Sequence, residues 1–330
     1  AATMVTAGIF MVARMSPLFE FSEAALSFVL VIGATTAFFM GLLGVVNNDI
    51  KRVIAYSTLS QLGYMTVALG ASAYSVAIFH LMTHAFFKAL LFLAAGSVIV
   101  AMHHEQDMRK MGGLKKYLPV TYWTALIGSL ALIGFPGTSG FFSKDALIEA
   151  VHASHIPGAS YAYWCVLLGV FVTAFYSFRL IFMTFHGPER FQAAHHDSHA
   201  HADGDHGHQG GHGSDHDHSH DDHGHHGAHD GPPKEAFWSI KLPLILLAVP
   251  SLLIGAFTIT PVLFGDYFGD AIFVSPEHDT VGHVGEAFHG IWGFMLHALQ
   301  GPVLYLMLAG VAAAWYLYIK RPDLPAVIAR

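Results

Sequence analysis

The sequence predicts an all-α protein, a polytopic membrane helix bundle in which one helix is broken. Hydrophobic residues occupy 54% of the 330 positions and charged residues 12%, whereas soluble domains carry about 25% charged residues. The charges fall between long apolar runs, and the basic residues gather in every second connection. A helix that crosses a bilayer needs about 20 mostly apolar residues, so these runs predict membrane spans.

Eight apolar segments fit this length, counting the first as partial. They are Ala1 to Val12, Ala24 to Val46, Val53 to Gly70, Tyr74 to Val100, Leu118 to Val151, Tyr161 to Phe185, Trp238 to Thr260 and Ile291 to Ile319. The first segment lacks an initiator Met, a basic leader and a cleavage site, so it resembles the tail of a membrane helix rather than a signal peptide. We therefore treat the chain as an internal fragment.

The connections between the segments alternate in charge. Lys and Arg occur in the second, fourth, sixth and last connections, whereas the first has only Arg14 at its edge and the other odd ones have none. The basic positions are Lys51, Arg52, Arg109, Lys110, Lys115, Lys116, Arg190, Lys234, Lys320 and Arg321. Because cytoplasmic loops are enriched in Lys and Arg, the even connections are expected to face the cytoplasm or its equivalent.

The segment from Leu118 to Val151 is too long for one span and contains the sequence GFPG at residues 134–137. Proline removes a backbone donor and glycine adds conformational freedom, which predicts two half-helices joined by unwound backbone. Lys144 and Asp145 follow the break. The alternative is a re-entrant or kinked helix in which Lys144 snorkels to an interface.

The segment at residues 77–94 carries His80, His84 and Lys88 at intervals of four, which places them on one helix face. A lysine inside a membrane helix costs about 2.5–3.5 kcal/mol on insertion scales, so it is expected to be paired, wetted or used. A buried lysine can act as a switchable proton store, and imidazoles can relay protons. The alternative is that both histidines are structural residues at a helix contact.

Other polar residues in the apolar segments are interpreted as structural. Ser57, Gln61 and Tyr64 recur at helical spacing and resemble residues that join helices by hydrogen bonds. Arg179, near the expected cytoplasmic end of its helix, is expected to snorkel. The single cysteine, Cys165, can form neither an internal disulfide nor an iron–sulfur cluster, so we expect no redox centre in this chain.

The stretch from His195 to Asp230 is rich in His, Asp and Gly and has almost no apolar residue, which predicts a disordered cytoplasmic loop at residues 187–236. A dispensable insertion is the first interpretation. The second is a loose metal buffer, with His195, His196, His199 and His201 as candidate ligands.

Four motifs carry a family resemblance: DIKRVIAYSTLSQLGYM, HLMTHAFFKALLFLAAGSVI, HHEQDMRKMGGLKK and GFPGTSGFFSKDALIEA. Residues 1–185 resemble the large antiporter-like subunits of proton-pumping NADH:quinone oxidoreductase, respiratory complex I, which are subunit L in bacteria and subunit 5 in mitochondria. The resemblance is weak beyond Phe185, and the His-rich insertion departs from the family.

The resemblance implies roles for particular residues. Lys88 matches the family's central lysine, His80 and His84 the histidines before it, and Lys144 the lysine of the broken helix, with Asp145 beside it. Asp49 and Arg52 match a cytoplasmic loop whose role is open.

The resemblance also implies a domain organisation. Residues 1–186 would be an antiporter-like core containing the second of two inverted repeats, residues 187–236 the loop, and residues 237–330 the last membrane helices. The first repeat and a lateral helix would be missing.

The resemblance further implies that NAD, FMN, iron–sulfur clusters and quinone are bound by partner subunits of complex I, and that no cofactor is bound here. The expected partners are the lipid bilayer and the adjacent antiporter-like subunit, in an inner membrane, with no nucleic acid. Related alternatives are a subunit of a cation/proton antiporter, of a membrane hydrogenase or of an inorganic-carbon uptake complex. More distant alternatives are a zinc transporter with a His-rich loop and a purely structural brace.

Overall fold

A computed structural model describes residues 4–191, 232–286 and 288–325. These residues form a helix bundle without any β-strand, which confirms the predicted fold class. The His-rich stretch, including His195, His196, His199 and His201, lies outside the described residues.

Long helices form the body of the bundle. They are α3 (Glu23–Val46), α4 (Ile50–Gly70), α5 (Tyr74–Ala101), α6 (Pro119–Ile133), α7 (Ser139–Ala153), α8 (Ala159–Phe185), α10 (Trp238–Leu263) and α13 (Pro302–Trp315), which continues as a π-helix over Tyr316–Lys320. Shorter helices are α1 (Ala7–Arg14), α2 (Ser16–Glu20), α11 (Thr280–Glu286) and α12 (Gly290–Ala298). Within the described residues, five stretches are long and apolar enough to cross a membrane: α3, α5, α8, α10 and Pro302–Lys320.

The last predicted span, Ile291 to Ile319, is wrong as a single helix. The structure divides it into α12 and α13 at Leu299, Gln300 and Gly301. Pro302 occupies the first turn of α13, where a proline needs no intrahelical hydrogen-bond partner and favours a new helix start. Only the second part, Pro302–Lys320, is long enough to span.

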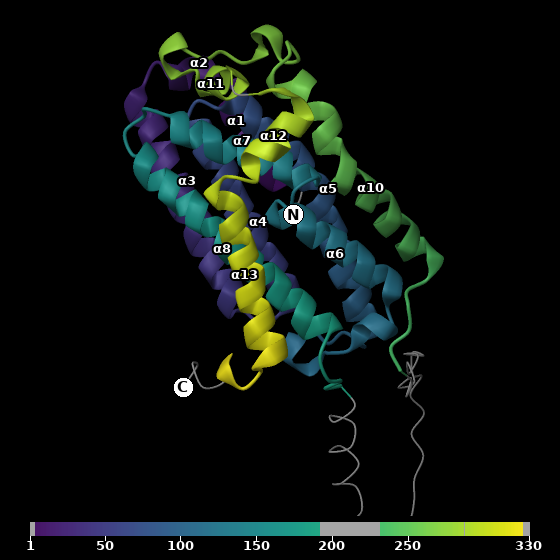
Figure 1. The fold of residues 1–330 in the computed structure, drawn as a ribbon. Helices are drawn as coiled ribbons and strands as arrows, with labels where there is room; N and C mark the ends of the chain where they lie inside the picture. Colours follow the sequence, from purple (N-terminus) through teal and green to yellow (C-terminus); the bar gives the residue numbers. More distant parts are fainter. Residues whose placement is uncertain (1–3, 192–231, 287, 326–330) are drawn as a thin grey trace, which may run out of the picture.

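The two ends of the bundle differ in composition (Figure 1). The turn at residues 47–49, the loop at residues 102–118 and the end of the π-helix lie at the lower end in the figure, which we call the basic end. Helices α1, α2, α11 and α12 lie at the other end, which we call the opposite end. Because the described residues of the even connections lie at the basic end, the bundle agrees with the charge alternation in the sequence.

Helix α8 is the central helix of the bundle, since 83% of its most apolar 18-residue stretch is buried. Helices α3 and α4 pack against each other through small residues. A Cβ at Gly63 would collide with the backbone of Ala37, and one at Gly33 would lie 2.8 Å from the amide nitrogen of Val67. Small residues allow such close backbone approach between membrane helices.

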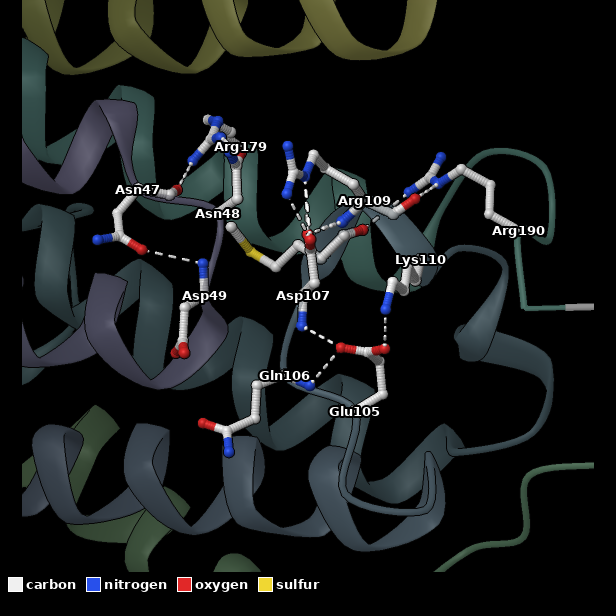
Figure 2. Close-up of polar contacts among 11 residues, drawn as sticks. Asn47, Asn48, Asp49, Glu105, Gln106, Asp107, Arg109, Lys110, Arg179 and Arg190 are labelled. Atoms are coloured by element: carbon white, nitrogen blue, oxygen red, sulfur yellow. Dashed lines mark hydrogen bonds and ion pairs between the residues drawn. The ribbon is translucent and has the colours of Figure 1, made fainter. Parts of the chain in front are cut away.

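Arg179 does not snorkel, contrary to the expectation. It is 4% exposed, and its guanidinium donates to the carbonyl of Asn47 and to Oδ1 of Asn48 (Figure 2). It also donates to the hydroxyl of Tyr318 at 2.9 Å. The side chain therefore ties α8 to the α3–α4 turn and to the π-helix.

Residues on both sides of the His-rich stretch are anchored to the bundle. Arg190 donates to the carbonyls of Arg109, Met108 and Met183 at 2.7–3.2 Å. Glu235 accepts from the amide of Val120 at 2.8 Å and from the hydroxyl of Thr121 at 2.7 Å. It thereby satisfies free donors in the first turn of α6, where a carboxylate also suits the helix dipole.

We expect Arg179→Met to lower the free energy of unfolding by about 2 kcal/mol or more, because it leaves buried acceptors without donors. Thermal unfolding of the detergent-purified protein measures the effect. Arg52→Met is the matched control, since Arg52 is 72% exposed and lies 3.9 Å from its partner Asp49. Equal unfolding midpoints for the two variants would contradict the assigned role.

We expect a variant in which a Gly/Ser linker replaces residues 195–230 to assemble like the native protein, because Arg190 and Glu235 keep their anchors. Glu235→Ala, with the stretch intact, is expected to destabilise α6 by about 1 kcal/mol through the lost cap. Yield and unfolding midpoint in membranes report both effects. Loss of assembly in the deletion alone would refute the dispensable-insertion interpretation.

Candidate functional site

Helix α5 presents His80, His84 and Lys88 along its inner face, and all three side chains are 0% exposed. The four-residue spacing in the sequence therefore does place them on one buried face, as predicted. None of them faces the outside of the bundle, where lipid would lie.

Lys88 is bound by neutral oxygen atoms. Its Nζ donates to Oγ of Ser57 at 2.6 Å and lies 3.4 Å from the carbonyl of Ile54, both on α4. Oγ of Ser57 lies 2.8 Å from the hydroxyl of Tyr176 on α8. Among the described residues no carboxylate pairs with Lys88, so nothing there fixes it permanently in the charged form.

A cavity of about 10 Å³ lies beside Lys88, lined also by Ser57, Ser129, Tyr176 and Ser177. This volume is about what one water molecule requires, and four of the lining residues besides the lysine carry hydroxyl groups. Aliphatic side chains complete the lining, those of Val53, Ile54, Leu91, Leu132 and Leu180, so the space beside the amine is small and its wall is mostly apolar.

His80 joins three helices. Its Nδ1 lies 2.9 Å from Oγ of Ser143 on α7, and its Nε2 lies 3.2 Å from Oε1 of Gln61 on α4. Thr83 adds a hydrogen bond of 2.8 Å to the same serine hydroxyl. His80 is thus the connection between the lysine face of α5 and the broken helix.

His84 differs from His80 because neither of its ring nitrogens has a hydrogen-bond partner in the part of the chain that the structure describes. Its ring packs edge-on against Phe87 at 5.4 Å and lies 6.2 Å from the ring of His80. A buried group of this kind is costly. Its position between His80 and Lys88 makes it a candidate relay.

The structure contains the predicted broken helix, and the break provides a hydrogen-bond acceptor for Lys144. Helix α6 ends at Ile133 and α7 begins at Ser139, with Gly134 at φ 80° and Gly137 at φ 89°, values that favour glycine. Nζ of Lys144 donates to the carbonyl of Leu132 at 2.8 Å. The last carbonyls of a helix lack intrahelical donors, so the lysine occupies a position that exists because the helix is interrupted.

Lys144 is 1% exposed, which excludes the snorkelling alternative. Its Nζ also lies 5.1 Å from the centre of the Tyr64 ring, within range of a cation–π interaction. The break itself is covered by α10, since Oγ of Ser139 donates to the carbonyl of Ser251 at 2.7 Å. The irregular backbone is therefore sheltered by protein, as membrane depth requires.

Asp145 is 5% exposed but is not joined to Lys144 by any hydrogen bond or ion pair among the described residues. Its Oδ2 has no hydrogen-bond partner there. Successive residues of a helix point in directions about 100° apart. The sequence neighbours therefore face different surroundings.

Asp49 and Arg52 lie at the basic end, away from the lysines. Oδ1 of Asp49 caps α4 by accepting from the amide of Arg52 at 2.8 Å, and its backbone pairs with that of Asp107 in a single β-bridge (Figure 2). Arg109 beside Asp107 holds the pKa of that carboxyl below its usual value, and Lys110 does the same for the pKa of Glu105. These contacts order the loop that joins α5 to α6.

Several site residues were missed or underrated. Ser57 and Gln61 were interpreted as residues that join helices, yet they bind Lys88 and His80. Ser143, Thr83 and Tyr176 were not predicted at all. Two features of the sequence could have indicated these roles. Ser143 directly precedes Lys144, and Ser57 lies four residues before Gln61, on the same helix face.

No group of three or more His, Cys, Asp or Glu side chains is placed to hold a metal ion within residues 4–191, 232–286 and 288–325. Cys165 is half-buried and has a free thiol. The buried amines of Lys88 and Lys144 and the buried imidazoles of His80 and His84 are groups that can hold and pass protons.

Comparison with known proteins is consistent with this site. The family described as NADH:quinone oxidoreductase/Mrp antiporter, TM, matches residues 1–175. NADH-quinone oxidoreductase subunit L of Neisseria meningitidis serogroup B is 60% identical over 332 residues, covering 100% of this chain and 46% of that protein. NADH-ubiquinone oxidoreductase chain 5 of Marchantia polymorpha is 60% identical over 188 residues, covering 57% of this chain and 28% of that protein.

The Neisseria match corrects the expectation that resemblance is weak beyond Phe185, because it extends over the whole chain. The structure of an Mrp complex from Dietzia sp. DQ12-45-1b shares the fold, with a TM-score of 0.53 and 20% identity over 88% of this chain and 50% of that one. The chain spans about half the length of the curated relatives that match it throughout. It belongs to the NADH:quinone oxidoreductase/Mrp antiporter transmembrane family and is a multi-pass protein of the inner membrane.

Proposed function

We propose that this chain carries the outer half of a proton path in a membrane subunit of NADH:quinone oxidoreductase, respiratory complex I. The observation that supports this most is the buried row Lys88, His84, His80 and Lys144, which crosses from α5 to the broken helix without a carboxylate partner. The subunit belongs to a translocase. The redox chemistry, with NAD, FMN, iron–sulfur clusters and quinone, takes place in partner subunits.

The proton route follows the contacts. Charge changes elsewhere in the complex perturb Lys88, which gives its proton to His84 one helical turn away. His84 passes it to His80, whose Nδ1 meets the hydroxyl of Ser143 at 2.9 Å. From this hydroxyl the proton reaches Lys144 of the same helix through water, and Lys144 releases it toward the opposite end. Hydroxyl groups and water complete the steps between these residues.

Repulsion between the two amines couples their charge states. Two ammonium groups in one dry network raise each other's energy, so a proton that arrives at one lysine favours release from the other. A carboxylate paired with either amine would oppose this effect by fixing the charge of that amine. The neutral oxygens around Lys88 and Lys144 instead leave both amines free to change charge.

Complex I is preferred over the related readings because the relatives at 56–60% identity are named as subunits of NADH-quinone or NADH-ubiquinone oxidoreductase. The adjacent antiporter-like subunit is the expected neighbour in the membrane. A zinc transporter is disfavoured, because two buried amines would repel a divalent cation.

We expect Lys144→Met, made in the full-length subunit within the complex, to reduce the number of protons pumped per NADH oxidised, because the last amine of the row is lost. Proton uptake or membrane potential in vesicles measures this. Lys241→Met is the control, since Lys241 lies near Trp238 at the start of α10. Unchanged stoichiometry in an assembled Lys144 variant would refute the proposal.

His84→Leu separates transport from structure. The change removes a buried imidazole without hydrogen bonds, whose burial costs about 1–3 kcal/mol, so the unfolding midpoint should stay constant or rise while pumping falls. His80→Leu breaks the contacts with Ser143 and Gln61 and should lower both. If His84→Leu leaves pumping intact, His84 is only a packing residue.

A further inference from the structure

A second, larger cavity of about 350 Å³ lies at the opposite end of the bundle. It is formed by the C-terminal half of α7, by α11 and by the turn between α12 and α13, which lie together at the top of Figure 1. Its titratable lining residues are Asp145, Glu149, His152, Tyr163, His283 and His297. The volume is enough for several water molecules.

Asp145 is the buried end of this cavity. The residue is 5% exposed and its Oδ2 has no hydrogen-bond partner among the described residues. Glu149 lies one helical turn further along α7, on the same face. Lys144 faces α6 and Tyr64 instead, so α7 has the lysine on one side and the two carboxyl groups on another.

Exposure increases from Asp145 outward. The side chains of Glu149 and His297 are 27% and 65% exposed, and Nε2 of His297 lies 3.2 Å from Oε1 of Glu149. His297 comes from α12, the short helix that sequence analysis merged into a longer span. A buried acid, a half-buried acid and an exposed imidazole thus line one cavity that is large enough for several water molecules.

We propose that Asp145, Glu149 and His297 form the proton-release site of this chain, an inference that rests on the proposed function. A proton from the Lys144 side neutralises Asp145. It then moves through the cavity to Glu149, which returns Asp145 to its carboxylate form. Glu149 gives the proton to Nε2 of His297, and the resulting imidazolium loses one proton to bulk water.

The test uses the full-length subunit in the assembled complex. Glu149→Gln removes a group that accepts and gives protons, so the rate of coupled proton translocation should fall about tenfold. This is less than the roughly 10²- to 10⁴-fold effect of general acid–base groups, because water in the cavity can carry part of the proton flow. Glu149→Asp keeps the carboxyl group and should restore most of the rate. NADH oxidation with an artificial electron acceptor, which bypasses the membrane arm, should be unchanged in both.

His297→Gln is the second variant, and because its side chain is 65% exposed it is not expected to disturb folding. It should slow translocation, and adding it to Glu149→Gln should cause little further loss, since both groups lie on one route. His155→Gln, an exposed histidine in the α7–α8 loop, is the control and should have no effect.

The outcomes separate the two proposals. If Lys144→Met blocks pumping while Glu149→Gln and His297→Gln pump normally, the release site is refuted and the proposed function stands. If Lys144→Met also pumps normally, the proposed function fails. Equal losses in Glu149→Asp and Glu149→Gln would show a structural role and likewise refute the release site.

Discussion

The structure depends on holding two lysine amines inside a membrane bundle without giving either a permanent counter-charge. Each amine needs an acceptor. Lys88 donates to the hydroxyl of Ser57 and, at 3.4 Å, to the carbonyl of Ile54, and Lys144 donates to the carbonyl of Leu132. A free carbonyl at membrane depth is available only where a helix stops. The break between α6 and α7 and Lys144 therefore depend on each other. The break leaves the carbonyl of Leu132 without a helical donor, and the amine of Lys144 donates to that carbonyl.

A broken helix in turn requires cover. Helix α10 supplies it by close backbone contact: a Cβ at Gly255 would lie 2.6 Å from the carbonyl of Ser139, and Ser139 bonds the carbonyl of Ser251. The His-rich stretch precedes α10 in the chain, yet Glu235 fixes the start of α6 before α10 begins. Helix α10, which covers the proposed proton route, and Glu235 before it thus lie outside residues 1–175, the part of the chain that matches the family.

The sequence predicted the helices, the break and the buried lysine face because these follow from local patterns: apolar length, glycine and proline, and four-residue spacing. It did not predict Ser57, Gln61 or Ser143 as partners, since these contacts depend on which helices pack together and in what register. Arg179 was mispredicted because snorkelling assumes a nearby interface, whereas the α3–α4 turn folds over the guanidinium. The last span was predicted as one helix because the apolar run from Ile291 to Ile319 is long enough to cross the membrane. Gly301 and Pro302, which indicate a helix boundary within this run, were not taken into account.

Helix α8 links two regions that are otherwise separate. Tyr176 contacts Ser57, the ligand of Lys88, and Arg179, almost one turn later, holds the α3–α4 turn and Tyr318. A rotation of α8 would thus disturb the lysine's ligand and the loops of the basic end at the same time. The two contacts lie three residues apart on one helix, so the surroundings of the Lys88 amine and the order of the loops at the basic end depend on the same short part of α8.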